Sequence, residues 1–499
     1  MSKFEDFGIG DVNKIEKNPD QLLSAEEDAT ALNGPDNSFK MFGKKSKYNP
    51  KSECRADLES EPVKEAIENA RRIYKEFEEE FLHKLDLADP ESIAFAYQEA
   101  ERRGIFKKAE EIRNLLFGKD MHFYGVVYTS DKCANNCSYC PAGELNREMT
   151  VDEGIVYPQK ALTLEQIVQE TNAVMDDGHT HICYLEGSPA KERIDNNSYA
   201  RKIARYVSGI IEETAERGLE EIILNIEPLT EDGFRIVAEA AKEANEKVGA
   251  NVSLQFRVFQ ETYNEEIYKE NHPQSQTGQA PKADYWNRRN SQARALRAGF
   301  DNVGLGSLIA GLNKHPLEEI RGLIEHIQDL RQEFPDVIPA RVCLPAASEL
   351  KNLHTRIPFV LETGQTRPKK EGETPGEFKY GDYEKAVELI YALAKLAMPE
   401  INIVSSERDT PEMLEVLNKY ATCTTLGVKP KIGENSGIPL ERMTSKRDIE
   451  AYNKAKEEGK ISTGFAQATV FPRNPKETIE GIKESGYNPI INLDAKNLQ

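Results

Sequence analysis

Eight short runs rich in β-branched and aromatic residues, each followed by a helical pattern, are the strongest constraint on the fold of this chain. They lie at 123–128, 181–185, 221–226, 253–259, 302–305, 340–344, 402–405 and 424–429. Strands that alternate with amphipathic helices predict βαβ units and a parallel sheet. Eight such units predict a closed (βα)8 barrel of the TIM type, an α/β fold. Helix starts are marked too: Thr163 opens a capping-box sequence, and Thr230 precedes the next amphipathic stretch.

The remaining segments are expected to surround this barrel, which we place at residues 119–435. Residues 1–55 are polar with little apolar periodicity and predict a poorly ordered arm. Residues 56–118 carry apolar positions spaced by three and four, which predict helices that cover one end of the barrel. Residues 362–382 are rich in Gly, Pro, Lys and Glu and predict an inserted loop. Residues 436–499 predict a C-terminal extension that ends in an αβ piece.

Three cysteines, Cys133, Cys137 and Cys140, follow the first predicted strand with Cys-x3-Cys-x2-Cys spacing. Chemistry in such barrels lies at the C-terminal ends of the strands, so the loop stands where a site is expected. Three thiolates can hold three irons of a cubane cluster and leave the fourth iron open. A structural zinc site is the alternative, but it needs four ligands, and no second cysteine or histidine pair follows. The motif therefore favours a 4Fe-4S cluster with one open iron.

Composition excludes several other classes of protein. A formal net charge of -20 and a pI near 5.1 argue against a general nucleic-acid or membrane surface. No apolar run approaches the roughly 20 residues of a membrane span, and the polar, acidic start is unlike a signal peptide. Seven cysteines, an odd number and mostly scattered, fit a reducing compartment better than a disulfide framework. We therefore expect a cytoplasmic protein.

The cysteine loop resembles that of the radical SAM superfamily. The resemblance implies that the amino and carboxylate groups of S-adenosylmethionine (SAM) chelate the open iron. One electron from the cluster then cleaves the sulfonium and gives a 5'-deoxyadenosyl radical. It also implies sensitivity to oxygen and a ferredoxin or flavodoxin as electron donor.

Fragments further along the chain resemble one branch of that superfamily, the aromatic amino acid lyases. They include the stretches at 258–263, 281–285 and 303–306, which read VFQETY, PKADY and VGLG. This branch holds the 2-iminoacetate synthase of thiamine biosynthesis, the tyrosine lyase of iron-iron hydrogenase maturation and a tryptophan lyase. The resemblance implies cleavage of the Cα–Cβ bond of tyrosine or a related substrate, with 2-iminoacetate and p-cresol as the products from tyrosine. It also implies a partner protein from the biosynthetic pathway.

The resemblance assigns roles to individual residues. Metal ligands would be Cys133, Cys137 and Cys140. Contacts with SAM would come from Tyr139, Glu186, Gly187, Ser188, Glu227 and Arg257. Catalysis and the substrate pocket would involve Tyr128, Gln260, Glu261 and Tyr263. From the residues alone, the two tyrosines of this last set can equally be core aromatics, and Glu261 an ion-paired barrel residue. His272 and Trp286 are expected to be structural, and Lys282 and Arg408 are left without a role.

Three departures from the branch bear on the reaction. Beyond Cys343 only Cys423 remains, so we expect no auxiliary cluster of the hydrogenase-maturase kind. The motif for the SAM amino group, normally Gly followed by Glu, is replaced by Glu186-Gly187-Ser188. A basic residue that commonly follows a proline after the sixth strand is Ala346 here. Either Arg341 or another cation takes its place, or the substrate lacks the amino acid headgroup.

These departures leave three hypotheses open. The first is a carbon-carbon lyase acting on tyrosine or a relative. The second is a radical SAM enzyme of the same fold with another substrate, which includes a maturase-like homologue without the auxiliary cluster. The third is a non-catalytic iron-sulfur scaffold.

Overall fold

A computed structural model describes residues 53–140, 142–144, 159–309, 312–345, 380–407, 409, 411–429, 431–457 and 474–498. The chain divides into two units, residues 1–45 and 46–499, and every described residue lies in the second. Most of the predicted arm and of the predicted insertion, together with Ala346 and Arg408, lies outside the described residues.

Eight parallel strands form a closed barrel in the described part of the chain. They are β1 (Asp120–Ser130), β2 (His181–Glu186), β3 (Glu221–Asn225), β4 (Ser253–Arg257), β5 (Asn302–Gly306), β6 (Arg341–Cys343), β7 (Asn402–Val404) and β8 (Cys423–Thr425). Each pairs with its neighbour in sequence, and β1 pairs with both β2 and β8, which closes the ring. The predicted TIM-type barrel is confirmed, and the eight predicted runs differ from the strands only at their ends.

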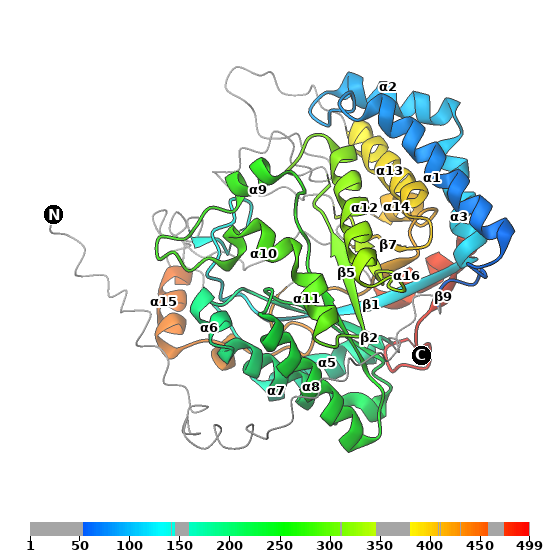
Figure 1. Cartoon of the computed structure of the whole chain (residues 1–499). Coiled ribbons are helices and arrows are strands. Elements are labelled where there is room, and N and C mark those ends of the chain that lie inside the picture. Colours follow the sequence, from blue (N-terminus) through cyan, green and yellow to red (C-terminus); the bar gives the residue numbers. More distant parts are fainter. Residues whose placement is uncertain are drawn as a thin grey trace, which may run out of the picture. The chain divides into compact units, whose positions relative to one another are not determined.

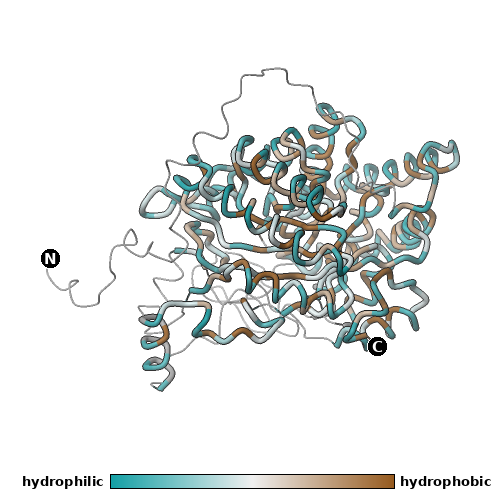
Figure 2. Tube along the Cα trace, turned by 90° about the horizontal axis from the view of Figure 1, so that it is seen from below, coloured by the Kyte–Doolittle hydropathy of each residue, from teal (hydrophilic) through white to brown (hydrophobic). Residues whose placement is uncertain are grey.

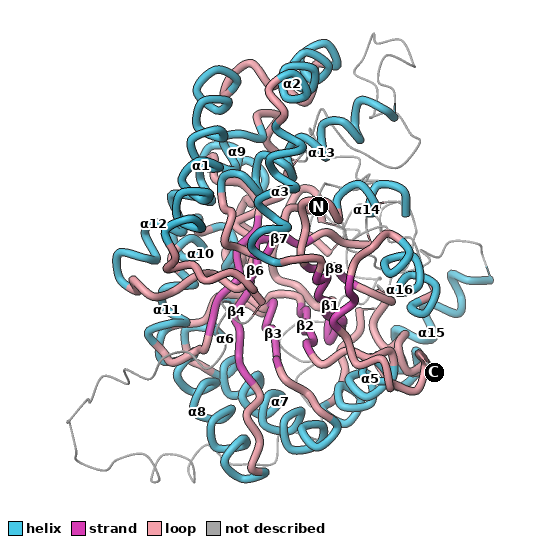
Figure 3. The backbone as a smooth tube through the Cα atoms, turned by 90° about the vertical axis from the view of Figure 1, so that its right-hand side faces the viewer, coloured by secondary structure: helices cyan, strands magenta, loops and turns pink. Residues whose placement is uncertain are grey.

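Helices surround the ring, as Figure 3 shows with the strands in magenta and the helices in cyan. They are α5 (Leu164–Asp176), α6 (Lys191–Asp195), α7 (Ser198–Thr214), α8 (Glu231–Val248), α9 (Glu265–Asn271), α10 (Tyr285–Arg289), α11 (Ser291–Arg297), α12 (Pro316–Glu333), α13 (Tyr380–Ala397) and α14 (Pro411–Leu417), with the 3-10 helices η4 (Ala215–Arg217) and η5 (Pro281–Ala283). The predicted caps are present: Thr163 and Gln166 complete a capping box, and the Thr230 hydroxyl accepts from the Gly233 N–H. Figure 2 shows hydrophilic residues along the outer turns of these helices.

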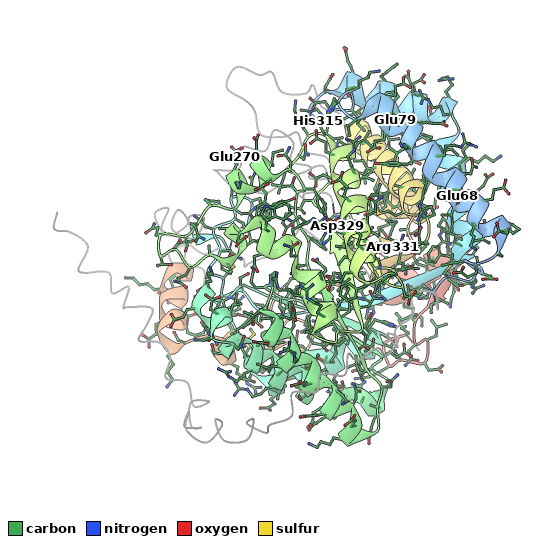
Figure 4. All side chains as sticks on the ribbon, in the orientation of Figure 1. Glu68, Glu79, Glu270, His315, Asp329 and Arg331 are labelled. Carbon is green, nitrogen blue, oxygen red and sulfur yellow. The ribbon has the colours of Figure 1, made fainter. Side chains whose placement is uncertain are left out.

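The three N-terminal helices, α1 (Glu61–Phe81), α2 (Pro90–Arg102) and α3 (Ile105–Phe117), pack against α13 on the flank of the barrel (Figure 1). We expected them to cover one end of the barrel; their main packing is against α13, and Arg113 of α3 also donates to the Ala421 and Asp120 carbonyls, where β8 and β1 begin. The reason for the packing against α13 is that this helix is buried on nearly all sides, so its outward apolar residues need a second layer of helices. The opposite face of α1 is charged, and Figure 4 shows Glu68 and Glu79 on it.

Polar side chains close the barrel where its strands begin. Arg341, at the start of β6, donates from Nη1 to Glu221 Oε2 at 2.6 Å and from Nη2 to Glu53 Oε1 at 3.2 Å. Glu53 also accepts from Asn402, and Glu221 accepts from Gln255 Nε2 at 2.9 Å. We call these five residues the base layer. Because they occupy the barrel axis at this end, a ligand site has to lie at the other.

The C-terminal extension contains η6 (Leu440–Arg442), α15 (Lys446–Glu457), α16 (Pro475–Glu484) and the short strand β9 (Asn488–Ile490). β9 pairs in parallel with the first residues of β1, Asp120 opposite Asn488. The expected αβ piece is therefore present, and it adds a ninth strand to the outside of the barrel sheet. Among the helices that the structure describes, none combines the length and the apolar character needed to cross a membrane.

Candidate active site

A cavity of about 210 Å3 opens at the C-terminal ends of the barrel strands. All three cysteines of the motif line it, together with residues from β1, β2, β3, β4, β6, β7 and β8 and from the segments that follow several of these strands. The lining contains apolar side chains from several strands, among them Val126, Leu185, Phe259 and Leu344. The cavity therefore joins the cysteine loop to the barrel interior, where its wall is partly apolar and partly charged.

Neighbouring loops hold the cysteine loop in place. The Ala134 N–H donates to the Ser188 carbonyl at 2.8 Å, and Ser138 donates to Asn271 through its N–H at 3.0 Å and its hydroxyl at 2.6 Å. Gly187 lies so close that a Cβ there would be 2.4 Å from the Lys132 carbonyl oxygen. The glycine that follows Glu186 is therefore required by this close approach of two backbones.

The three thiols suit an iron-sulfur cluster in number and surroundings. Cys137 is 6% exposed and packs with Tyr139, Leu308 and Leu312 in a small apolar cluster. Burial raises the pKa of the Cys140 thiol to about 11 and also raises the pKa of Cys137, so metal binding has to displace protons. Within the described ranges, no group of three or more His, Cys, Asp or Glu side chains is arranged so that it could hold a metal ion. The ligand role of the three cysteines stays a prediction from the motif.

A buried carboxylate lies beside the cysteine loop. Glu227 follows β3, and its Oε2 accepts from the Ser188 hydroxyl at 2.5 Å and from Asn135 Nδ2 at 3.2 Å. Its Oε1 is buried and has no hydrogen-bond partner among the described residues. Buried polar atoms are normally satisfied, so an orphan carboxylate oxygen on a cavity wall fits the donor group of a ligand, such as an ammonium. Asn135, which belongs to the cysteine loop itself, was not singled out from the sequence.

Glu261 is ion-paired on the same wall. Its Oε1 accepts from Lys282 Nζ at 2.5 Å and lies 3.6 Å from Arg288 Nη2, while Arg288 Nη1 lies 3.8 Å from Glu227 Oε2. Glu261 has φ +70°, in the left-handed region that a non-glycine residue adopts at a cost of about 1–3 kcal/mol. The sequence offered either a catalytic or an ion-paired residue, and the structure shows an ion pair that also faces the cavity.

Tyr139 is fixed by hydrogen bonds on both sides of its hydroxyl. Lys282 Nζ donates to it at 3.0 Å, and His272 Nε2 lies 2.7 Å away. His272 Nδ1 is 2.8 Å from the Tyr268 carbonyl oxygen, so Nδ1 carries the proton and Nε2 accepts from the tyrosine. Burial lowers the pKa of His272 far below its usual range, which keeps the ring neutral. His272 is thus a structural support, as expected.

The predicted catalytic residues separate into two groups. Tyr128 and Glu261 line the cavity, whereas Gln260 and Tyr263 do not. Gln260 is buried behind the wall, and the Tyr263 hydroxyl lies 2.9 Å from His326 Nδ1 on α12. Phe259 and Glu261 line the cavity on either side of Gln260, and the backbone at Glu261 is left-handed rather than extended. Gln260 and Tyr263 are therefore not part of the described lining of this cavity, and their catalytic role stays a prediction.

The residues predicted to contact SAM all reach the cavity wall. Tyr139, Glu186, Gly187, Ser188, Glu227 and Arg257 are all part of the lining. Glu186 is engaged, because Lys202 on α7 donates to it, so Glu227 is the acid that still offers an oxygen.

Arg341, one of the cations offered in place of the basic residue missing at position 346, does not reach this cavity. It is bound to Glu53 and Glu221 in the base layer, so that option is wrong. The cations on the described lining are Arg257, Lys282 and Arg288. The sequence left Lys282 without a role and did not single out Arg288, because their carboxylate partners lie 21 or more residues away in the chain.

A closed parallel barrel with a three-cysteine loop after its first strand agrees with the radical SAM resemblance of the sequence. No family model matches the chain. It is 24% identical to the 2-iminoacetate synthase of Salmonella typhimurium over 307 residues, 62% of this chain and 66% of that protein. Identity to the 2-iminoacetate synthase of Escherichia coli is 25% over 306 residues, 61% of this chain and 65% of that protein. The chain thus spans just under two thirds of the length of these curated relatives.

Solved structures agree with the fold. The FeFe-hydrogenase maturase HydG from Carboxydothermus hydrogenoformans superposes with a TM-score of 0.58 at 22% identity, over 88% of this chain and 85% of that one. Methylornithine synthase (PylB) gives a TM-score of 0.50 at 16% identity, over 88% of this chain and 99% of that one. Together these likenesses confirm the predicted barrel and the predicted resemblance to the radical SAM aromatic amino acid lyases.

Proposed function

We propose that this chain is a radical SAM carbon-carbon lyase that cleaves the Cα–Cβ bond of tyrosine or a related substrate. The observation that carries the proposal is one cavity, inside a closed barrel, that joins Cys133, Cys137 and Cys140 to the orphan oxygen of Glu227. The curated relatives named 2-iminoacetate synthase support the reaction type.

Each group on the wall has a defined task in this proposal. A 4Fe-4S cluster on the three cysteines, with SAM bound, would supply the one-electron cleavage that starts the reaction. Glu227 Oε1 would accept a hydrogen bond from the SAM amino group, with Asn135 and Ser188 holding the carboxylate in position. Tyr139, fixed by Lys282 and His272, would shield the cluster side of the cavity.

The apolar part of the cavity wall would surround the reacting part of the substrate. Val126, Leu185, Phe259 and Leu344 exclude water, which keeps a reactive intermediate from being quenched. Tyr128 lies at the end of β1 on the same wall, where it can contact the substrate. Electrons would come from a ferredoxin or flavodoxin. Together with the oxygen-sensitive chemistry, this electron donor implies a cytoplasmic enzyme. We further expect a partner protein from the biosynthetic pathway.

Anaerobic turnover tests this function. The reconstituted protein, given dithionite, SAM and tyrosine, should form 5'-deoxyadenosine and p-cresol, measured by liquid chromatography and mass spectrometry. Cys137→Ala should lower both products to the level without enzyme. Cys423→Ala is the matched control, because Cys423 is a buried cysteine of β8 that does not line the cavity.

Two outcomes separate the alternatives. Deoxyadenosine without cresol would reject tyrosine and favour the second candidate, the same chemistry on another substrate, to which Ala346 already points. Absence of deoxyadenosine from a protein with an intact cluster would reject the class of enzyme and favour an iron-sulfur scaffold.

A further inference from the structure

We infer that Arg257 binds the carboxylate group of the substrate at the deep end of the cavity. The inference deepens the proposed function by naming the chemistry of one substrate group and the residue that selects it. It also changes the expected role of Arg257, which the resemblance assigned to SAM.

The position of Arg257 separates it from the cysteine loop. Arg257 is the last residue of β4, and its guanidinium lies 4.3 Å from the ring centroid of Tyr124 in the middle of β1. Tyr124 precedes Cys133 by nine residues and lies below the end of its strand. Cys183 and Cys343, two further side chains of the lining, are close enough to interact electrostatically with Arg257. Arg257 therefore belongs to a deeper layer than the loop that carries the motif.

The charge of Arg257 lacks a counter-ion in the described part of the chain. The residue is 2% exposed, and its Nε and Nη1 have no hydrogen-bond partner there. No described acidic side chain forms an ion pair with it, whereas Lys282 and Arg288 both pair with Glu261. A buried charge without a partner is strongly unfavourable, so a chain that keeps one on a cavity wall leaves it for a ligand.

The backbone is also shaped around this side chain. Gly304 on β5 pairs with Arg257, and a Cβ at Gly304 would lie 2.7 Å from both Cγ and Cδ of the arginine. Any other residue at position 304 would push the guanidinium out of its present place. The glycine therefore gives Arg257 a fixed orientation, which a binding group needs.

A carboxylate suits this site better than other partners. A guanidinium matches the two oxygens of a carboxylate, and the apolar walls above it suit the rest of a small organic acid. The carboxylate of SAM is the other source of the same group. It would bind at the cysteine loop, in the shallower layer, so the two sources predict different results when Arg257 is replaced.

Binding to the reconstituted, SAM-loaded holoenzyme tests the inference. The variants are Arg257→Met, Arg257→Lys and the control Arg289→Met. Arg289 is a buried arginine outside the cavity lining that pairs at 2.7 Å with Asp329, labelled on α12 in Figure 4. Equilibrium dialysis measures the affinity for L-tyrosine, L-tryptophan, 3-(4-hydroxyphenyl)propionate, tyramine and inorganic phosphate. EPR of the reduced cluster, with and without SAM, reports SAM binding separately.

The expected result is selective loss of carboxylate binding. Arg257→Met should weaken the best carboxylate probe by about 30-fold, Arg257→Lys should lose less, and Arg289→Met should match the wild type. Tyramine, which lacks the carboxylate, should bind all variants equally weakly. The response of the cluster spectrum to SAM should persist in Arg257→Met. The ligand-free variant should also unfold at a temperature equal to or above that of the wild type, because an unpaired buried charge has been removed.

Other outcomes overturn the inference. Carboxylate affinity that is unchanged in Arg257→Met would reject it, as would loss of the response of the cluster spectrum to SAM in that variant. Binding of phosphate alone that depends on Arg257 would also reject it, and so would a wild type that binds none of the carboxylate probes. A wild type that binds tyrosine through Arg257 and forms no cresol would reject tyrosine cleavage and leave the inference standing.

Discussion

Two buried arginines of the same barrel, Arg341 and Arg257, show how the base layer and the cavity differ. In the base layer, Arg341 is held by Glu53 and Glu221, and the neighbouring Asn402 and Gln255 bind the same carboxylates. In the cavity, Arg257 has an aromatic ring beside it and no carboxylate among the described residues. The base is completed by the protein's own groups, whereas the cavity leaves charges for a ligand. Such incomplete pairing inside a well-packed fold is typical of a functional site.

Replacement of Arg341 is expected to have the largest effect. Arg341→Met should lower the free energy of unfolding by about 3–5 kcal/mol, because it leaves Glu53 and Glu221 buried without their cation. Chemical denaturation followed by circular dichroism measures the change. Arg257→Met is the matched variant and should lose little or no stability. Equal losses in the two variants would contradict the difference between the base layer and the cavity.

Lys395 on α13 adds an intermediate case, a buried cation that donates to carbonyl groups and lies 4.6 Å from the ring centroid of Phe117. Its Nζ donates to the Ile401 carbonyl at 2.8 Å and to the Pro399 carbonyl at 3.3 Å. Burial, with repulsion from Arg113, lowers the pKa of Lys395 to about 7. Above that pH the unfolded chain binds more protons at this residue than the folded chain does, so folding becomes more favourable as pH rises.

The contribution of Lys395 to the free energy of unfolding should therefore increase by roughly 2 kcal/mol between pH 7 and pH 9. It would level off near pH 10.4, where the unfolded lysine also loses its proton. Lys395→Met should remove this increase, so the difference in stability between variant and wild type should shrink by that amount. A difference that does not vary with pH would show that Lys395 titrates normally.

The smallest expected effect concerns the fit between Gly304 and Arg257. Gly304→Ala should lower the free energy of unfolding by about 1–3 kcal/mol, because its Cβ would overlap the arginine side chain. In an Arg257→Ala background most of this loss should disappear, since the overlapping Cγ and Cδ are absent. A double-mutant cycle of denaturation curves measures the coupling. Additive losses would mean that Gly304 is required for some other reason.

The barrel could be predicted from the sequence because each strand and helix carries its own periodic pattern and its own cap. The cysteine loop could be placed because it directly follows the first strand. The placement of α1 to α3 could not, since an amphipathic pattern shows that a face is buried and not what buries it. The split between Glu261 and Gln260 depends on a left-handed backbone at Glu261 that no local signal marks. Arg341 was misjudged because its partners, Glu53 and Glu221, are at least 120 residues away in sequence.

The most direct test of the account is the EPR spectrum of the reduced, reconstituted protein before and after addition of SAM. If the cavity holds a cluster with one iron left open by Cys133, Cys137 and Cys140, SAM should change the g values of the reduced cluster. Glu227→Gln should weaken the apparent affinity for SAM in the same titration. A spectrum that SAM leaves unchanged, in a protein with a full complement of iron and sulfide, would contradict the account.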